Sequence, residues 1–395
     1  MTRVIVAGGG IVGQTIAASI ATQSHLAVTL LTGPRAPADA RSSAISAAGR
    51  KLFSRIGVWP GVADDAQPIE DMQITDCATD DLIRPSVLSF TGGEGADAFA
   101  FMVPNTALRG ALAARCAALP IDVRRDTATF YDETDEGVRV RLTTGETVDG
   151  AVLIAADGRG SRLRRIAGIE TVEKFYDQWG ITGTITHSAP HHGRAVQHFF
   201  AAGPLAMLPL PGDSSSIVWT ERPAFAKSLG EMDPMIASLE IERVFGLSLG
   251  RLCVEPPLQV YPLSAMIARD FCAGRVALAG DAAHVIHPLA GQGLNLGLRD
   301  AAALAETLAL AHRHGEDVAL ALPRYARWRR ADVVEMALVT DRLNAIFSQR
   351  SDLLRAVRSI GLGLVDRRDG LKSFFIGEAS GLSGDVPKLM RGEAV

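Results

Sequence analysis

The chain has 395 residues, of which 47% are hydrophobic and 21% charged, so a disordered or collagen-like protein is excluded. A length of this order predicts two closely joined domains. The formal net charge of −4 at pH 7 argues against nucleic acid as a partner. The four cysteines form no Cys-x-x-Cys pair, so we expect reduced thiols in a cytoplasmic protein, and neither disulfides nor zinc ligands.

The N-terminus does not have the pattern of a signal peptide. Arg3 and the apolar residues 4–7 are followed at once by Gly8, Gly9 and Gly10, and no apolar core comes after them. Nowhere does the chain reach the run of about 18 apolar residues that a spanning helix needs. We therefore expect a soluble protein that is at most peripheral to a membrane.

The first segment predicts a strand, a glycine turn, a helix and a second strand. Residues 4–7 (VIVA) and 27–31 (AVTLL) are short apolar runs typical of buried strands, and residues 14–22 predict the helix between them. The helix returns the chain to the same edge of the sheet, so the two strands should be parallel.

The turn has the spacing Gly8-x-Gly10-x-x-Gly13. The first glycine permits a tight turn, the second lets a pyrophosphate approach the backbone, and the third lets helix and strand pack closely. This context favours dinucleotide binding over a glycine-rich turn without a ligand. An acidic residue usually ends the second strand and binds the ribose, but here Thr32 follows it, and Asp39 is expected to lie too far away.

The rest of the chain alternates between sequence patterns typical of helices and of strands. We predict helices over residues 41–56, 105–118, 233–245 and 293–346, and strands over residues 138–142, 148–155 and 276–279, within a mostly β stretch from 171 to 265. This order predicts an α/β fold in which a Rossmann-like nucleotide domain is interrupted by a β-rich domain and followed by a helical C-terminal region. The expected boundaries are 1–69, 104–170 and 271–350 for the nucleotide domain, 70–103 and 171–270 for the β-rich substrate domain, and 351–395 for the C-terminal region.

Two further turns favour a flavin over a nicotinamide as the bound cofactor. Asp157 and Asp281 each follow a predicted buried strand, at the edge where open α/β sheets bind ligands. Asp281 can accept a hydrogen bond from a ribityl hydroxyl. Gly291 and Gly293 leave room for a flat ring, and the positive end of the following helix can stabilise the negative charge of a reduced flavin. His284 and His287 have no third ligand at a suitable spacing, so we expect no metal site.

These three glycine-bearing segments, in this order, resemble the single-component flavoprotein aromatic hydroxylases, whose fold is that of para-hydroxybenzoate hydroxylase. The string HPLAGQGLNLGLRDAAALAE, with YPLSAM and LPLPGDSSSIVW before it, resembles more narrowly the UbiH-type hydroxylases of ubiquinone biosynthesis. The resemblance covers nearly the whole chain, and Thr32 is its main departure.

The resemblance implies an extended FAD and a set of contact residues. Pro288 and Gly291 match backbone positions beside the flavin ring, where catalysis takes place. The residues that match cofactor-binding positions are Gly8, Gly10, Gly13, Arg41, Asn105, Arg109, Asp157, Asp281, Gly291, Gly293, Leu294 and Asn295.

The resemblance also implies a reaction. NADH or NADPH reduces the FAD, O2 forms a flavin C4a-hydroperoxide, and its terminal OH is transferred to the ring of a polyprenylated phenol. Three alternatives stay open: hydroxylation of a small soluble phenol, reduction of isoprenoid double bonds, and a non-catalytic flavin-bearing subunit of a quinone-synthesis complex. Two readings stay open for a set of apolar residues, which either line a substrate pocket or are ordinary sheet core: Phe199, Phe200, Leu208, Pro209 and Trp219. A homo-oligomer is also left open.

Residues 342–375 differ in charge from the rest of the chain. They contain seven basic and three acidic residues, interleaved with apolar residues at mostly helical spacing. A basic amphipathic helix of this kind suits the anionic surface of the inner membrane or a membrane-associated partner. The alternative is that the apolar side packs on the nucleotide domain.

Overall fold

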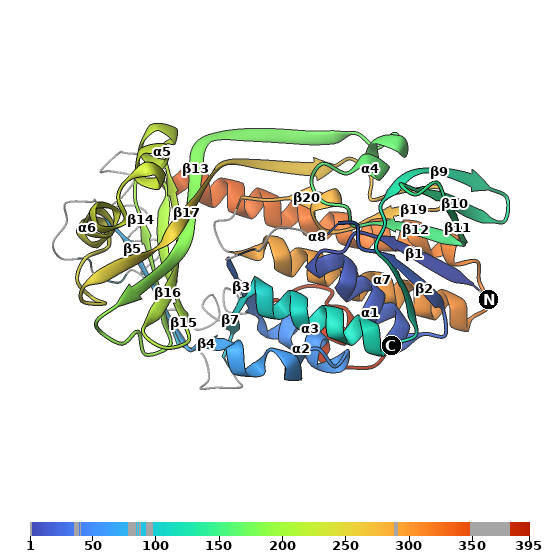
Figure 1. The fold of residues 1–395 in the computed structure, drawn as a ribbon, viewed down its shortest axis with the longest axis horizontal. Coiled ribbons are helices and arrows are strands. Elements are labelled where there is room, and N and C mark those ends of the chain that lie inside the picture. The colour runs from blue at the N-terminus through green and yellow to red at the C-terminus, as the bar shows by residue number, and fades with distance from the viewer. Residues whose placement is uncertain are drawn as a thin grey trace.

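The computed structural model describes residues 2–34, 39, 41–77, 84, 86, 88–91, 98–287, 291–347 and 380–395. Within them, a nucleotide body and a β-rich body lie side by side and are connected by two long strands (Figure 1). The predicted α/β architecture, with a Rossmann-like body interrupted by a β-rich one, is confirmed.

The nucleotide body is built around a sheet in the order β18-β19-β12-β1-β2-β8. Apart from the antiparallel pair β18–β19, all neighbours run parallel, because helices and longer excursions connect them. Residues Val4 to Val6 of β1 are completely buried, as expected for the centre of a sheet covered on both faces. The strands are β1 (Arg3–Ala7), β2 (Ala27–Leu31), β8 (Ile121–Arg124), β12 (Val152–Ala155), β18 (Cys272–Ala273) and β19 (Val276–Leu278).

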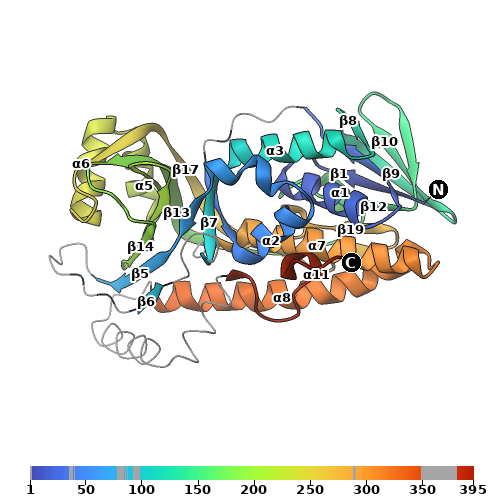
Figure 2. The same ribbon diagram turned by 90° about the horizontal axis from the view of Figure 1, so that it is seen from below.

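Helices and a small antiparallel sheet cover the nucleotide sheet. The helices α1 and α7 pack against each other, and Figure 2 shows α8 running along both bodies. The helices are α1 (Ile11–Gln23), α2 (Ala47–Arg55), α3 (Asn105–Ala118), α4 (Arg162–Ile166), α7 (Gln292–Arg313), α8 (Val318–Phe347) and α11 (Lys388–Arg391). The small sheet consists of β9 (Ala128–Thr134), β10 (Gly137–Leu142) and β11 (Thr147–Gly150). Among the described residues, none of the helices combines the length and the apolar character needed to cross a bilayer.

The β-rich body contains a sheet in the order β20-β17-β13-β16-β15-β14-β5-β6. Helices α5 (Pro223–Glu231) and α6 (Pro234–Phe245) cover one face and bury a second hydrophobic cluster beneath them. The strands β13 (Thr171–His187) and β17 (Leu252–Ala268) reach from this sheet to the nucleotide body (Figure 1). The other strands are β5 (Asp71–Asp76), β6 (Leu88–Thr91), β14 (Arg194–Phe199), β15 (Pro204–Leu210), β16 (Ser214–Glu221) and β20 (His284–Val285).

A three-stranded sheet lies between the two bodies. It contains β3 (Ser42–Ser46), β7 (Ala100–Pro104) and β4 (Gln67–Ile69), in that order. A third apolar cluster, which includes Met102 and Leu210, joins it to the large sheet. The two bodies therefore meet through packed side chains as well as through the long strands.

Three predicted elements differ from the structure, and one helix was not predicted. Residues 41–56 were predicted as one helix, but β3 comes first and pairs with β7, and Ser46 then caps α2 by accepting a hydrogen bond from the Gly49 amide at 3.1 Å. Residues 148–155 divide into β11 and β12, because one pairs with β10 and the other with β1. The helix predicted from 293 to 346 is two helices, α7 and α8, and α5 was missed. The predicted domain boundaries stay a prediction.

Candidate active site

In the glycine turn after β1, two glycines are closely packed and one borders open space. Gly8 has φ +139°, and a Cβ there would lie 2.0 Å from the Ala156 carbonyl oxygen. A Cβ on Gly13 would lie 1.9 Å from the Gly8 carbonyl oxygen, so neither position tolerates a side chain. A Cβ on Gly10, in contrast, would have no heavy atom within 4 Å. The Gly10 backbone therefore borders space that a ligand can enter, at the N-terminus of α1.

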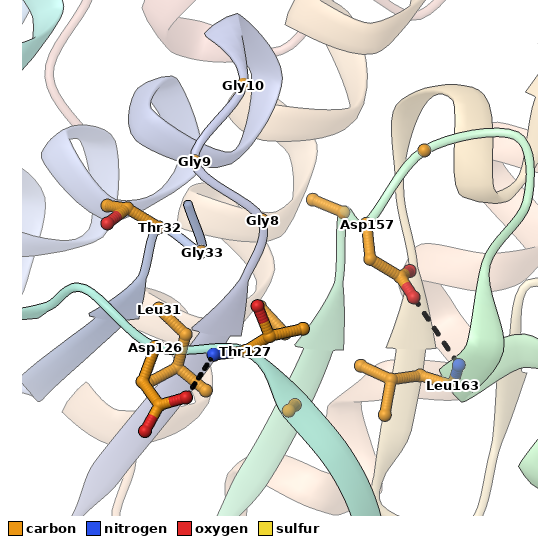
Figure 3. Close-up of a pocket in the computed structure, with 14 residues that line it drawn as sticks. Gly8, Gly9, Gly10, Leu31, Thr32, Gly33, Asp126, Thr127, Asp157 and Leu163 are labelled. Atoms are coloured by element: carbon orange, nitrogen blue, oxygen red, sulfur yellow. Dashed lines mark hydrogen bonds between the residues drawn. The ribbon is translucent and has the colours of Figure 1, made fainter. Parts of the chain in front are cut away.

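This space is a cavity of about 320 Å³ (Figure 3). Its wall includes the glycine turn, Thr32, Gly33 and the loop from Asp126 to Ala128. The Thr32 hydroxyl donates to the Arg124 carbonyl oxygen at 3.3 Å. Sequence reasoning missed Asp126, whose carboxylate accepts hydrogen bonds from Thr127, Thr143 and Thr144 and holds the cavity wall in place.

Asp157 also lines this cavity, but its carboxylate accepts hydrogen bonds from the start of the next helix, α4. It accepts hydrogen bonds from the Ser161 hydroxyl at 2.6 Å and the Arg162 amide at 3.0 Å, and Figure 3 shows it directed towards Leu163. The buried Arg164 then donates to the Ala282 carbonyl oxygen at 2.8 Å. The loop after β12 is thus tied to the turn that contains Asp281.

A buried network holds that second turn, η4 (Gly280–Ala282). One oxygen of Asp300 accepts hydrogen bonds from the Gly280 amide at 2.9 Å and from His284 Nε2 at 2.6 Å, and the other accepts from Arg329 Nε at 2.8 Å. Burial alone would raise the pKa of Asp300, but His284 and Arg329 outweigh it and lower the pKa. His284 is therefore a structural hydrogen-bonding residue, and the aspartate is held as a carboxylate.

Asp281 itself is open to solvent and makes no hydrogen bond or ion pair with the described residues. The surrounding protein still encloses its carboxyl enough that partial desolvation raises the pKa, against the charges of His284, Arg41 and Arg159. A recessed carboxylate with free acceptor positions suits a ligand hydroxyl.

Three of the predicted cofactor residues meet at Asp39. Its carboxylate accepts hydrogen bonds from Arg41 Nε at 2.8 Å, Arg41 Nη2 at 3.0 Å and Asn105 Nδ2 at 2.9 Å, and Arg109 Nη2 lies 3.6 Å away. Burial would raise the pKa of Asp39, but the hydrogen bonds from Arg41 and Asn105 hold it at about 2. Sequence reasoning considered Asp39 only as a distant ribose ligand and missed this role.

The start of α7 faces β3. The Asn295 side chain accepts a hydrogen bond from the Ser46 amide at 3.0 Å and donates to the Ala44 carbonyl oxygen at 2.9 Å. Gly291 has φ +62°, which favours glycine, and a Cβ on Gly293 would meet open space. Leu294 packs against the core of the nucleotide body. Pro288 lies outside the described residues.

The structure places the apolar residues considered for a substrate pocket in packed regions of the β-rich body. Phe200 and Trp219 are part of the cluster beneath α5 and α6, so they are sheet core. Phe199 is also buried, and Leu208 packs on the cluster between the sheets. The face of the large sheet opposite α5 and α6 meets Arg41 around a second cavity of about 100 Å³.

Comparison with known proteins agrees with this geometry. The model of the FAD binding domain family matches residues 1–339. Ubiquinone hydroxylase UbiL of Rhodospirillum rubrum is 37% identical, with 98% of this chain and 92% of that protein aligned. The 3-demethoxyubiquinol 3-hydroxylase of Escherichia coli is 32% identical, over 96% of this chain and 99% of that protein.

Solved structures share the fold. The p-nitrophenol 4-monooxygenase PnpA of Pseudomonas putida superposes with a TM-score of 0.81 at 18% identity, over 98% of this chain and 100% of that chain. The protein is thus an FAD-dependent aromatic-ring monooxygenase, and its chain belongs to the FAD binding domain family, among relatives that include ubiquinone hydroxylases.

Proposed function

We propose that the protein hydroxylates the aromatic ring of a polyprenylated phenol in ubiquinone biosynthesis, with NADH or NADPH and O2 as cosubstrates. The observation that carries this proposal is the extent of the match to UbiL, 98% of this chain. The match includes the β-rich body, whose face opposite α5 and α6 meets the nucleotide body and would contact a substrate. A likeness limited to the nucleotide body would support FAD binding alone.

The residues fit an extended FAD. The turn of Gly8, Gly10 and Gly13 would hold the pyrophosphate, because only Gly10 borders open space and the N-terminus of α1 attracts negative charge. Asp281 would accept a ribityl hydroxyl. Gly291 and Gly293 would lie beside the ring.

When bound, FAD supplies the redox chemistry: it takes a hydride from the nicotinamide and activates O2. The protein contributes position and electrostatics. The 22-residue helix α7 directs the positive end of its dipole at the ring site, which favours the negative charge of the reduced state. Asp300, His284 and Arg329 fix the Asp281 turn, and Asp39 orients Arg41.

A peripheral contact with the inner membrane is part of this proposal. A polyprenylated substrate is nearly insoluble in water, so an enzyme that uses it gains by docking where it resides. The basic amphipathic segment 342–375 supports such a contact. Apart from residues 342–347, this segment lies outside the described residues.

The test is a coupled assay on the purified, FAD-loaded protein. With a prenylated phenol we expect equal consumption of NAD(P)H and O2 and formation of one hydroxylated product. Turnover only with short soluble phenols would contradict the proposed substrate class. Hydride transfer to the isoprenoid chain without O2 consumption would replace hydroxylation by reduction. In cells that lack the protein, an unhydroxylated quinone precursor should accumulate.

A further inference from the structure

The face of the large sheet opposite α5 and α6 carries a row of polar side chains. Along β13, Ile181 and Ile185 point into the core under α5 and α6, so the alternate residues Thr182 and Thr184 lie on the opposite face. Across the ladder to β17, Thr182 pairs with Gln259, and Gly180 pairs with Tyr261. The polar row therefore spans the pair β13–β17, and Arg41 lines the same cavity as its members Thr182, Thr184 and Gln259.

A small cavity lies at this row. Its volume of about 100 Å³ is smaller than the ~150 Å³ of an engineered cavity that binds benzene, so it accepts a ring substituent or a ring edge and cannot enclose a dinucleotide. Its lining residues are Arg41, Thr182, Gly183, Thr184, Glu255, Pro256, Pro257 and Gln259.

Thr182 has an unsatisfied hydroxyl in this wall. The residue is only 7% exposed, and among the described residues its Oγ1 has no hydrogen-bond partner. An unpaired buried hydroxyl is unfavourable unless a ligand or water satisfies it. The hydroxyl of Tyr261 lies near that of Thr182. Burial raises the pKa of Tyr261, against the charge of Arg41 and the nearby Thr182 hydroxyl, so the phenol is neutral and can donate.

One glycine and two charged residues determine the shape and the polarity of the cavity. A Cβ on Gly180 would lie 3.0 Å from the Tyr261 ring, so the glycine makes room for that ring against the strand. The charge of Arg41 is already paired with Asp39, and the exposed Glu255 adds a carboxylate. The cavity therefore suits a neutral group that both donates and accepts, and does not suit a phosphate or a carboxylate.

The cavity is also close to the proposed cofactor site. Arg41 lines the cavity and also interacts electrostatically with Asp281, in the turn that would bind FAD. A ligand whose polar edge enters the cavity can have its remaining ring atoms outside it, on the side of the nucleotide body.

We propose that Thr182, Tyr261 and Gln259 bind the hydroxyl group on the aromatic ring of the substrate and thereby decide which ring carbon faces the FAD. The inference rests on the proposed function and adds to it the part of the substrate that is recognised. Thr182 Oγ1 accepts a hydrogen bond from the substrate hydroxyl, the Tyr261 hydroxyl donates one to the substrate oxygen, and the Gln259 amide can accept or donate. The three are binding residues, and no proton has to leave the substrate at this step.

Binding of two probes to the FAD-loaded protein tests the inference without turnover. Ortho-prenylphenol carries the hydroxyl, whereas prenylbenzene lacks it, and calorimetry measures the binding of each. We expect Thr182→Val and Tyr261→Phe each to weaken ortho-prenylphenol binding about threefold to tenfold, the range for one lost hydrogen bond, and to leave prenylbenzene binding unchanged. Thr182→Ser should restore the affinity. Thr186→Val, on the same strand and outside the cavity, and Tyr131→Phe, in β9, are matched controls that should bind both probes normally.

Turnover gives a second readout. In Thr182→Val we expect a mixture of hydroxylated isomers and more hydrogen peroxide per NAD(P)H, because the ring is no longer held in one orientation. Unchanged affinity for ortho-prenylphenol in both variants would overturn the inference. Slower flavin reduction by NAD(P)H with unchanged phenol binding would assign the cavity to the nicotinamide instead. A wild-type protein that binds ortho-prenylphenol more tightly than prenylbenzene but hydroxylates no prenylated phenol would refute the proposed function and leave the cavity assignment standing.

Discussion

At the scale of single residues, two aspartates near the cofactor site differ in their surroundings. Asp39 has a low pKa because Arg41 and Asn105 hydrogen-bond to its carboxylate, and it orders three side chains. Asp281 has a raised pKa and makes no hydrogen bond or ion pair with the described residues. The first is a structural anion and the second is available to a ligand.

Asp281→Ala should weaken FAD retention by about 1–3 kcal/mol, the cost of removing one partner of a buried polar group. The purified wild-type protein should be yellow, and titration of the apoprotein with FAD measures the difference. Asp281→Asn keeps an acceptor oxygen and should lie between the two. Equal FAD affinity in wild type and Asp281→Ala would refute the role of this carboxylate, and a folded, colourless wild type that cannot be reconstituted would refute flavin binding itself.

Two buried histidines make stability depend on pH. Burial lowers the pKa of His198 and of His287 to about 4 each. An unfolded histidine takes up a proton below about pH 6.5, whereas these two stay neutral until about pH 4, so acidification in this window favours the unfolded chain. The free energy of unfolding should be constant above pH 6.5 and fall by about 1 kcal/mol per histidine by pH 5.5.

Urea unfolding at pH 7.5 and pH 5.5 measures this loss. His198→Gln and His287→Gln should each reduce the difference between the two pH values, whatever their effect on stability at pH 7.5. His25→Gln, at an exposed position, is the control and should leave the difference as in wild type. A difference that stays the same in both buried-site variants would show that other groups cause it.

At the scale of elements, the turn between β1 and α1 makes a sharp prediction. Gly10→Val should abolish FAD binding, because its side chain would enter the space beside the N-terminus of α1. Thr32→Ala should cost only about 0.5–1.5 kcal/mol, the value of one neutral hydrogen bond, and Thr32→Glu should tighten binding by adding a charged acceptor. FAD titration of the three variants measures these differences in affinity. Loss of FAD from Thr32→Ala as complete as from Gly10→Val would show that Thr32 is a principal ligand.

The elements also show how far the sequence predicts this structure. Continuous apolar runs such as 4–7 and 27–31 predicted β1 and β2 correctly, because central parallel strands are buried on both faces. β3 was missed because SSAIS is weakly apolar and is a strand through pairing with β7, more than 50 residues away. The role of Asp39 was missed partly for the same reason, since Asn105, one of its partners, is 66 residues distant in the sequence. Contacts of this kind depend on the tertiary fold, and local periodicity contains no information about them.

At the scale of the whole molecule, the proposed membrane contact makes a prediction about lipid binding. The full-length protein should float with anionic liposomes at low salt, and a variant with four arginines replaced by Gln should float less, because each basic group near the surface contributes about 1 kcal/mol. The four are Arg355, Arg358, Arg367 and Arg368, all outside the described residues. Activity of the variant on a short-chain phenol controls for an intact catalytic site. Equal flotation of both proteins, or of neither, would remove the lipid contact from the proposed function.

The two long strands have a consequence for cooperativity. β13 and β17 form an antiparallel ladder from Thr171 and Ala268, beside the nucleotide body, to His187 and Leu252 at the far end of the large sheet, with irregularities between Phe175 and Trp179 and between Thr182 and Thr184. Lys174 and Gln178 of β13 also bond to Asp341 and Asn344 of α8, a helix that packs on the nucleotide sheet at its other end. Neither body can melt without breaking hydrogen bonds that the other supports. Calorimetry should therefore show one transition in which the calorimetric and van't Hoff enthalpies agree, and added FAD, although it contacts mainly the nucleotide body, should raise the melting temperature of both bodies together.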